Sequence, residues 1–383
     1  MKHVWLRMAM GAMAWGVAAV LGAGDAQAQP VQIAQVAGGD RHTCAIDTAG
    51  QVWCWGYNNY GQIGDGTTTD RLTPVLVDGV TGAVALALGG THSCAIDGEG
   101  QTWCWGDGGF GQLGNGPGLE QSLTPIVVPG MTRTVSISAG YRHVCGLQAR
   151  GQLYCWGFGY AGQIGVGTTE DAMSPRRVRS LRRRSAEVAL GWVHTCARQR
   201  NGRVNCWGAG SSGQLGIGST TNQLVPVQVG GLRNVATLAL GALHSCAVLE
   251  RGRVRCWGRN DSGQLGDGTT TDRLNRVRVR GLSRVAQVAL GDSSSCALRN
   301  NGRVRCWGNN AAGQLGDGTT TQRLAPTEIS TLSNVTQIAV GGAFGCAVSD
   351  GGRLQCWGRN GDGQLGDGTT SNRLTPVDVV FPE

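Results

Sequence analysis

The chain has 383 residues and an unusual composition, with 65 Gly, 14 Cys and 12 Trp against 4 Phe. Glycine at this level without a three-residue period excludes collagen, and 40% hydrophobic residues with many tryptophans argue against wholesale disorder. Helical bundles are effectively ruled out, and a turn-rich all-β architecture is favoured. The formal net charge is +8, and Lys2 is the only lysine, so arginine supplies nearly all of the positive charge.

Residues 1–28 have the pattern of a secretory signal peptide. Lys2 and Arg7 give a basic start, residues 8–24 are mostly apolar and small, and Ala26-Gln27-Ala28 offers an A-x-A cleavage site. We expect cleavage after Ala28, with an uncleaved signal anchor as the alternative. No later stretch is apolar enough to span a bilayer, so there is no transmembrane segment to expect. The pattern predicts a secreted or periplasmic protein in an oxidising compartment.

The rest of the chain is a repeat array. Seven cysteine pairs, each ten residues apart, recur every 50 or 51 residues. Each copy contains four short segments with period-2 alternation, separated by glycine-rich turns, and we name them strands A to D. Examples are 285–290 for strand A, 295–298 for strand B, 303–308 for strand C and 375–379 for strand D.

Four strands in each of seven copies predict a seven-bladed β-propeller of four-stranded antiparallel blades. The expected blades cover about 31–81, 82–132, 133–183, 184–233, 234–283, 284–333 and 334–383. The first copy begins with a strand A and the last one stops after a strand D, so we expect the ring to close between the chain ends. The sequence does not show how that seam is sealed. A single domain, 29–383, and a monomer are expected.

The cysteine spacing fits a β-hairpin. If Cys44 faces Cys54, a three-residue loop, 48–50, remains between strands B and C, with glycine at the left-handed position such loops require. Directly opposed residues lie close enough for a disulfide, and an exported protein seldom leaves so many thiols unpaired. Reduced buried cysteines are the alternative, and zinc is disfavoured because each pair lacks a second pair. The predicted disulfides are Cys44–Cys54, Cys94–Cys104, Cys145–Cys155, Cys196–Cys206, Cys246–Cys256, Cys296–Cys306 and Cys346–Cys356.

The GQLGDGTT segments, the Trp-Gly of strand C and the G-x-x-H motif before strand B resemble the regulator of chromosome condensation repeat family. The resemblance covers all seven copies and implies a seven-bladed propeller. It also implies two candidate functions, nucleotide exchange on the GTPase Ran and secreted β-lactamase inhibition, because members of the family have these activities. An exported protein would meet neither Ran nor chromatin. The paired cysteines depart from the family pattern, so no target is carried over.

Repeated polar residues are expected to build the fold. Five histidines, His42, His92, His143, His194 and His244, each precede a strand-B cysteine by two residues, and Ser294 and Phe344 take that place in the last two copies. We interpret them as packed or hydrogen-bonded structural residues, with a metal ring as the alternative. The GDGT aspartates, Asp65, Asp267, Asp317 and Asp367, are interpreted as turn residues, with a calcium or acid/base role as the alternative. A G-x-G-x-x-G match at 106–111 is attributed to the repeat. No catalytic residue, metal or cofactor is expected, and an enzyme of unknown reaction is a minor hypothesis.

Function is expected where the copies differ. In an up-and-down blade the A–B and C–D loops lie at one end, so the variable loops share one face. Aromatic residues and arginine often anchor protein interfaces, which makes this face the predicted protein-binding surface; a carbohydrate-binding surface and simple packing between loops are the alternatives. The predicted binding residues are Tyr57, Tyr60, Phe110, Tyr141, Arg142, Phe158, Tyr160 and Trp192 in blades 1 to 4, whereas blades 5 to 7 offer Arg259, Asn260, Asp261, Asp292, Asn309, Asn310, Arg359, Asn360 and Asp362.

Charge is distributed unevenly around the ring. Residues 131–309 contain 25 Arg and 8 acidic residues, whereas residues 29–130 contain 2 Arg and 9 acidic residues. We expect the basic sector on the rim and on the face opposite the aromatic loops, where an anionic partner such as an acidic polysaccharide would be attracted. An arginine-rich surface without a partner is the alternative, and no nucleic-acid partner is expected. The densest basic patch is Arg176, Arg177, Arg179, Arg182, Arg183 and Arg184.

Overall fold

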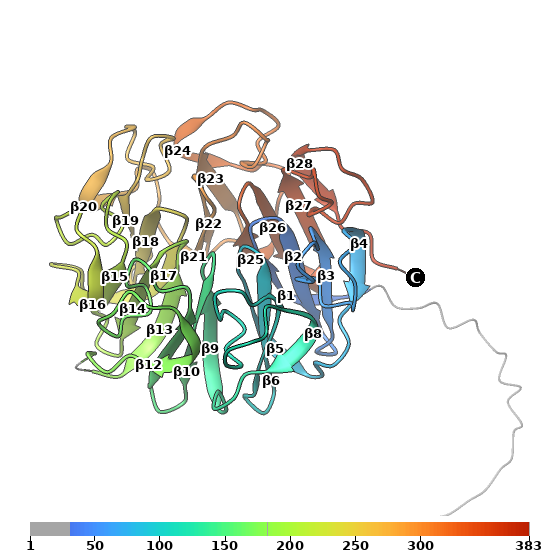
Figure 1. The fold of residues 1–383 in the computed structure, drawn as a ribbon. Helices are drawn as coiled ribbons and strands as arrows, with labels where there is room; N and C mark the ends of the chain where they lie inside the picture. Colours follow the sequence, from blue (N-terminus) through green and yellow to red (C-terminus); the bar gives the residue numbers. More distant parts are fainter. Residues whose placement is uncertain (1–30, 182, 383) are drawn as a thin grey trace, which may run out of the picture. The chain divides into compact units, whose positions relative to one another are not determined.

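The computed structural model describes Val31–Pro382 except Arg182, and the predicted leader lies outside these residues. This unit is a ring of seven four-stranded antiparallel sheets, each formed by four consecutive strands (Figure 1). The seven-bladed propeller is therefore confirmed. Strand A of each blade contacts strand A of its neighbours, so the A strands line the axis. The blades are β1–β4 (Ile33–Gly38, His42–Asp47, Val52–Gly56, Arg71–Leu76), β5–β8 (Ala83–Leu88, His92–Asp97, Thr102–Asp107, Gln121–Val127), β9–β12 (Thr134–Ala139, His143–Gln148, Leu153–Gly157, Ala172–Arg177), β13–β16 (Ser185–Leu190, His194–Gln199, Val204–Gly208, Gln223–Gln228), β17–β20 (Val235–Leu240, His244–Leu249, Val254–Gly258, Arg273–Arg278), β21–β24 (Val285–Leu290, Ser294–Arg299, Val304–Gly308, Arg323–Glu328) and β25–β28 (Val335–Val340, Phe344–Ser349, Leu354–Gly358, Arg373–Asp378), with a 3-10 turn η1 at Asp350–Gly352.

The hairpin between strands B and C has the predicted register. Cys44 pairs with Cys54 across β2 and β3, their Cα atoms lie 4.1 Å apart, and a disulfide joins them. The other six blades repeat this pair, so all seven expected disulfides are present. Gly50 ends the loop with φ +80°, and a Cβ there would lie 2.9 Å from Gly82 of the next blade. The glycine therefore allows both the turn and the close approach of a neighbour.

Strand D forms the outer edge of each blade. The sequence predicted the last strand D at 375–379, but β28 begins earlier, at Arg373, which pairs with Gly358. The register shifts between Cys356 and Gly358, and this bulge extends the pairing toward the C–D loop. Proline removes a backbone donor and is tolerated at such edges. It stands in strand D of six blades, as Pro74, Pro125, Pro175, Pro226, Pro326 and Pro376, whereas blade 5 has Arg276.

Each blade is joined to the next by a buried tryptophan. The strand-C indole Nε1–H donates to the backbone carbonyl of the GQ(L/I)G glutamine in the preceding blade, as Trp307 does to Gln264 at 2.8 Å. The glycine that follows leaves room for the ring, because a Cβ at Gly266 would lie 2.7 Å from the Trp307 Nε1 atom. All seven blade boundaries contain this hydrogen bond. The tryptophan and the GQ(L/I)G motif together form an inter-blade link.

Four of the five histidines form a second inter-blade link and all five are buried, which confirms their structural role. The His143 Nε2 atom lies 2.9 Å from the Thr195 hydroxyl of the next blade, and that hydroxyl donates to the Gln163 carbonyl. The hydroxyl uses its only proton on the carbonyl, so it accepts from Nε2. His42, His194 and His244 make equivalent contacts with Ser93, Ser245 and Ser295. His92 faces blade 3, which has Val144 at the hydroxyl position, and neither of its ring nitrogens has a hydrogen-bond partner within the described residues.

The seam between blades 7 and 1 uses the tryptophan link found at the other boundaries. The Trp55 Nε1 atom and the Thr43 hydroxyl both donate to the Gln364 carbonyl, at 3.0 and 2.7 Å. The Gln337 side chain exchanges two hydrogen bonds with the backbone of Val36. Figure 1 shows β1 beside β25 and β26, and each terminal blade consists of its own four strands. Side-chain and backbone contacts therefore seal the ring, without strand exchange.

Replacing Thr195 by Val should lower the free energy of unfolding by about 1–3 kcal/mol, because the buried His143 Nε2–H would lose its acceptor. Thr43→Val is the matched control: Thr43 also donates to a glutamine carbonyl, but the residue facing it across the boundary is Phe344, which needs no partner. We expect a smaller loss for the control in urea unfolding with the disulfides intact. Equal losses would mean that the hydroxyl-to-carbonyl bond, rather than the histidine contact, carries the effect.

Candidate functional site

The A–B and C–D loops lie together at one end of the propeller. In blade 1 the Tyr57 N–H, just after β3, donates to the Arg41 carbonyl in the A–B loop at 3.0 Å. The same backbone hydrogen bond occurs in every blade, for example from Phe158 to Arg142 and from Arg359 to Ala343. The two variable loops of each blade are thus joined directly. We call this end of the molecule the loop face.

The aromatic residues predicted for this face are brought into two groups. In blades 2 to 4 a continuous row is formed: Phe158 lies between Phe110 and Tyr160, with ring centroids 5.1 and 6.3 Å away. The Arg142 guanidinium lies 4.7 Å from the centroid of Phe110 and 5.6 Å from that of Tyr141. Tyr141 in turn packs against Trp192 at 5.1 Å. The row contains six of the eight predicted residues.

The remaining two, Tyr57 and Tyr60, form a separate pair in blade 1 with ring centroids 6.5 Å apart. Arg41 lies 4.2 Å from the centre of the Tyr57 ring, and its guanidinium also pairs with Asp362 of blade 7. Arg41 was not singled out from the sequence. Tyr160, Tyr60 and Trp192 are the exposed members of the two groups, at 76%, 41% and 38%. Their rings are therefore available for contact, while the other five residues are half-buried and support them.

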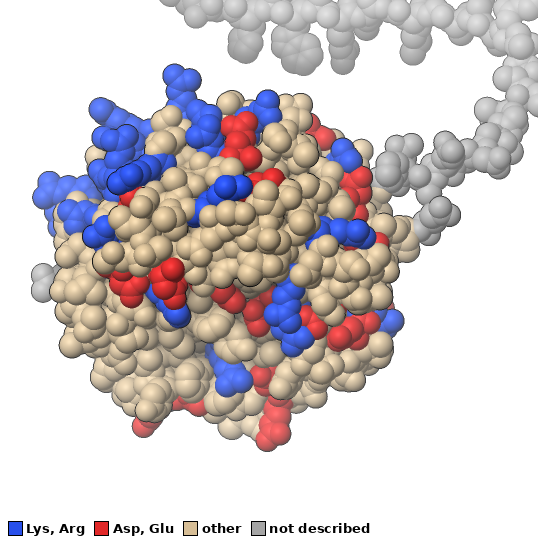
Figure 2. All heavy atoms as spheres, turned by 90° about the horizontal axis from the view of Figure 1, so that it is seen from above, with Lys and Arg blue, Asp and Glu red and all other residues tan. Residues whose placement is uncertain are grey.

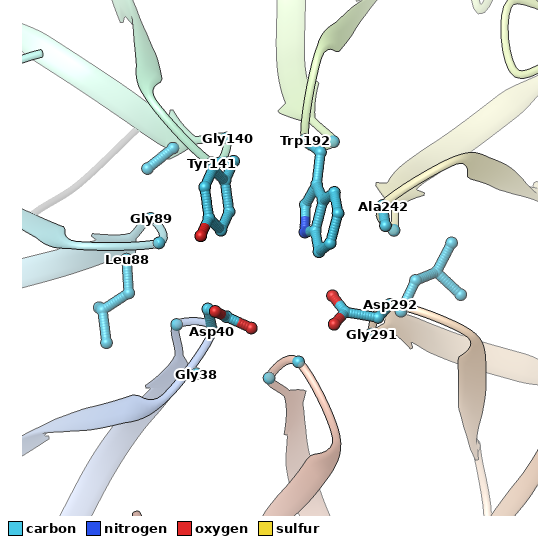
Figure 3. Close-up of a pocket in the computed structure, with 18 of the residues that line it drawn as sticks. Gly38, Asp40, Leu88, Gly89, Gly140, Tyr141, Trp192, Ala242, Gly291 and Asp292 are labelled. Carbon is cyan, nitrogen blue, oxygen red and sulfur yellow. The ribbon is translucent and has the colours of Figure 1, made fainter. Parts of the chain in front are cut away.

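The loop face opens at its centre into the mouth of the axial channel, a cavity of about 90 Å³ lined by the A–B loops of all seven blades. Figure 3 shows Tyr141 and Trp192 on one side of the mouth and Asp40 and Asp292 on the other. Glycine or alanine takes the equivalent position in the other three blades, as Gly90, Ala242 and Gly342. The four large residues therefore decide what this opening accepts.

The two carboxyl groups at the mouth titrate unusually. Burial raises the pKa of Asp292 to about 7, and the charge of Asp40 adds to this rise, while Trp192 and Arg359 oppose it. Burial also raises the pKa of Asp40, against the effects of Arg41 and Arg359. Two carboxyl groups beside aromatic rings favour a cation or a hydrogen-bond donor over an anion. Asp40 was missed in the sequence, although it occupies the same repeat position as Tyr141 and Trp192.

Several polar residues predicted on the loop face lie inside the loops instead. Asn260, Asn310 and Asn360 are at most 1% exposed, so their assignment to an exposed loop surface is wrong. The Asn260 amide donates to the Thr269 and Thr271 carbonyls, and its oxygen accepts the Leu265 N–H. The GDGT aspartates are confirmed as turn residues: Asp65, Asp267, Asp317 and Asp367 each accept from a threonine N–H in their own loop and from the arginine that begins strand D of the same blade.

The predicted basic patch lies at the end of blade 3, in β12 and the link to blade 4. Arg177, Arg179, Arg183 and Arg184 line one hollow together with Arg150 of the B–C turn. Arg176 lies 3.9 Å from Glu170, and Arg182 is outside the described residues. The B–C turn and the D–A link are opposite the loop face. The two predicted sites are therefore separate.

Between Val31 and Pro382, with Arg182 left out, no group of three or more His, Cys, Asp or Glu side chains is arranged to hold a metal ion. No helix among these residues is both long enough and apolar enough to cross a membrane. Seven disulfides suggest an oxidising extracellular or periplasmic environment.

Comparison with known proteins agrees with the repeat pattern. The RCC1-like domain model matches residues 177–383, and the regulator of chromosome condensation (RCC1) repeat model matches 49–96, 99–147 and 150–198. The ultraviolet-B receptor UVR8 of Arabidopsis thaliana is 32% identical over 200 residues, which are 51% of this chain and 46% of UVR8. The probable E3 ubiquitin-protein ligase HERC4 of Homo sapiens is 32% identical over 210 residues, 52% of this chain and 20% of HERC4. The matched regions span less than half of these relatives.

Solved propellers support the same fold. Human WBSCR16 has a TM-score of 0.79 at 22% identity, covering 87% of this chain and 95% of that structure. Yeast RCC1 (Prp20), solved bound to Kap60, has a TM-score of 0.78 at 22% identity, covering 86% and 83%. At this identity the likeness concerns the fold alone. The family models cover more than half of the sequence, and the chain belongs to the family of RCC1-like domains built from RCC1 repeats.

Proposed function

We propose that this disulfide-bonded propeller is an exported binding module that holds a protein partner on the loop face of blades 1 to 4. The observation that carries the proposal is the row from Tyr160 to Trp192, in which exposed aromatic rings are supported by half-buried neighbours. Tyrosine, tryptophan and arginine are the residues most often found as interface anchors, because they offer large contact areas at low conformational cost. The supporting contacts hold these rings in place before a partner arrives.

The channel mouth adds a requirement on the partner. Trp192 belongs both to the aromatic row and to the mouth, so a surface that contacts the row also covers Asp40 and Asp292. Both carboxyl groups would be desolvated by an apolar surface, which is unfavourable unless a donor reaches them. We expect the partner to place a basic or amide side chain at the mouth, surrounded by residues that pack on Tyr141 and Tyr160. Export follows from the predicted leader and agrees with the seven disulfides.

A carbohydrate-binding surface protein is the second candidate. The exposed rings of Tyr60 and Tyr160 are the observation in its favour, because aromatic faces also bind sugar rings. A glycan would lie across these rings on the surface of the loop face. Nucleotide exchange, β-lactamase inhibition and an enzyme of unknown reaction have no specific observation in their favour.

Affinity capture tests this proposal. Protein lacking residues 1–28 is used as bait in parallel with a triple variant, Tyr60→Ala, Tyr160→Ala and Trp192→Ala. A matched control, Arg259→Ala with Asp261→Ala, removes an exposed ion pair from the same face in blade 5 without changing the net charge. We expect the original protein and the control to capture a partner that the triple variant does not. Capture by all three would contradict the proposal, and selective binding on a glycan array would favour the second candidate.

A further inference from the structure

Blade 5 has two arginines directly opposite each other at its outer edge. Arg255 of β19 pairs with Arg278 of β20, and the described residues contain no ion pair for either side chain. Like charges opposite each other on antiparallel strands destabilise a sheet. The flanking arginines increase the effect: burial and the charges of Arg253, Arg278 and Arg276 lower the pKa of Arg255. This edge therefore concentrates positive charge at a cost in stability.

In blades 6 and 7 the residue equivalent to Arg278 is acidic and forms an ion pair with an arginine. In blade 6 the equivalent of Arg278 is Glu328, which lies 3.3 Å from Arg305 and 3.8 Å from Arg303. In blade 7 it is Asp378, which lies 2.6 Å from Arg353. Blade 5 retains the strand-C arginines of blade 6 but replaces the acidic residue by arginine. Local stability therefore does not explain Arg278.

A second position in blade 5 also carries an arginine where the other blades have an uncharged residue. Arg276 stands where the other six blades have proline in strand D. Its guanidinium donates to the Gly230 carbonyl in the link between blades 4 and 5, at 2.6 Å. The positive charge thus continues from blade 5 along the rim toward blade 4. Figure 2 shows Lys and Arg side chains gathered at the left of the view, the side on which Figure 1 places β19 and β20.

We propose that Arg253, Arg255, Arg276 and Arg278 form a binding edge for an extended anionic polysaccharide, whose sulfate or carboxylate groups lie between Arg255 and Arg278. An anionic group there would replace the carboxylate that Glu328 supplies in blade 6 and relieve the like-charge contact. Guanidinium groups bind such oxyanions with paired, charge-assisted hydrogen bonds. A linear chain fits because the charge runs along the rim rather than forming a closed pocket. This edge is distinct from the aromatic row, so the inference does not depend on the proposed protein partner.

The test uses dextran sulfate as the probe and neutral dextran of equal length as its control. The variant Arg278→Glu recreates the pair of blade 6, so we expect its unfolding midpoint in urea to rise while its affinity for dextran sulfate falls about tenfold or more. Arg278→Lys keeps the charge but loses the paired hydrogen bonds of the guanidinium, so its affinity should lie between those of the original protein and of Arg278→Glu. Arg359→Glu makes the same charge change on the loop face and should affect binding much less, since Arg359 is remote from this edge.

If Arg278 had only a structural role, its replacement by Glu would not give a protein that is more stable and yet binds dextran sulfate more weakly. Unchanged affinity of Arg278→Glu for dextran sulfate would overturn the proposal, whatever its stability. An equal loss for Arg359→Glu would also overturn it, because binding would then follow net charge alone. Anionic phosphatidylglycerol vesicles and single-stranded DNA are run in parallel, and preference for either over dextran sulfate would refute the polysaccharide assignment.

Discussion

Acidification from pH 7.5 to pH 5 should strongly destabilise the ring, because five buried histidines must remain neutral in it. Burial lowers the pKa of His42, His143, His194 and His244 to about 3 and that of His92 to about 4. Between these values and about 6.5 the unfolded chain binds more protons than the folded one, so stability is full above about pH 6.5 and is lost as the pH falls. At pH 5 the loss is about 2 kcal/mol for each histidine.

Other titrating groups can be separated from this effect. The pKa values of Asp292, about 7, and of Asp40 are both raised, so their contributions have the opposite sign, and that of Asp292 offsets about one histidine over the same interval. The GDGT aspartates have lowered pKa values, so their stabilisation is lost only below about pH 4. The interval from pH 6.5 to 5 therefore reports mainly on the histidines.

The chain itself supplies the control variant. Blade 7 has Phe344 at the histidine position, buried and packed, so His244→Phe copies an arrangement that the repeat already contains. Ser295 would keep its hydrogen bond to the Gln264 carbonyl. Urea unfolding at pH 7.5 and pH 5 should show a pH-dependent loss about 2 kcal/mol smaller in this variant. An unchanged pH dependence would contradict the assignment of the acid effect to buried neutral histidines.

Reduction of the disulfides is expected to have a comparable effect. Each disulfide closes a short loop and stabilises by roughly 2–3 kcal/mol in the chain-entropy model. Seven such contributions together are at least comparable to the whole stability of a typical domain, about 5–15 kcal/mol. The fourteen cysteines are at most 1% exposed, so reduction has to be carried out in denaturant with a thiol, followed by alkylation. After dilution, the near-UV circular dichroism of the folded ring should not return.

A variant that lacks the disulfide of one blade measures the contribution of a single disulfide to the free energy of unfolding. Cys296→Ala with Cys306→Ala removes one disulfide and should lower the free energy of unfolding by about 2–3 kcal/mol while leaving the other six intact. Peptide mapping without reduction should find only pairs ten residues apart. A fully reduced protein that refolds with its original spectrum would show that the cysteines act only as small buried residues.

The sequence predicted the blades well because the decisive interactions inside a blade are local. The ten-residue cysteine spacing and the glycine at the loop position defined the B–C hairpin, as in Cys44, Gly50 and Cys54. The seam could not be derived in this way, since it joins residues far apart in the chain: Trp55 donates to Gln364 across 309 positions. The period of the GQ(L/I)G motif gives no indication of which group its carbonyl binds.

The loop face was only partly predicted, because its residues come from different blades and their contacts are not local in the sequence. Comparison of the repeats showed that Tyr141 and Trp192 differ from the residues at the equivalent position of other blades. Asp40 was overlooked, although it occupies the same position, two residues before a histidine. The error over Asn260, Asn310 and Asn360 was avoidable, because an asparagine precedes each GDGT aspartate by seven residues, as Asn58 precedes Asp65. Such joint occurrence indicates a hydrogen bond within the loop. The packing of Phe110, Phe158 and Arg142 into one row needed the inter-blade distances.

A binding titration tests the central claim, that the exposed aromatic rings of the loop face in blades 1 to 4 hold a protein partner, most directly. The captured partner is purified and titrated into three proteins: the original, the triple variant at Tyr60, Tyr160 and Trp192, and the Arg259/Asp261 control. Interface anchors cost about 2 kcal/mol or more each when truncated, so the triple variant should bind at least about 100-fold more weakly. The control should bind within about threefold of the original protein, because exposed ion pairs contribute little. Equal affinities for the triple variant and the original would contradict the account.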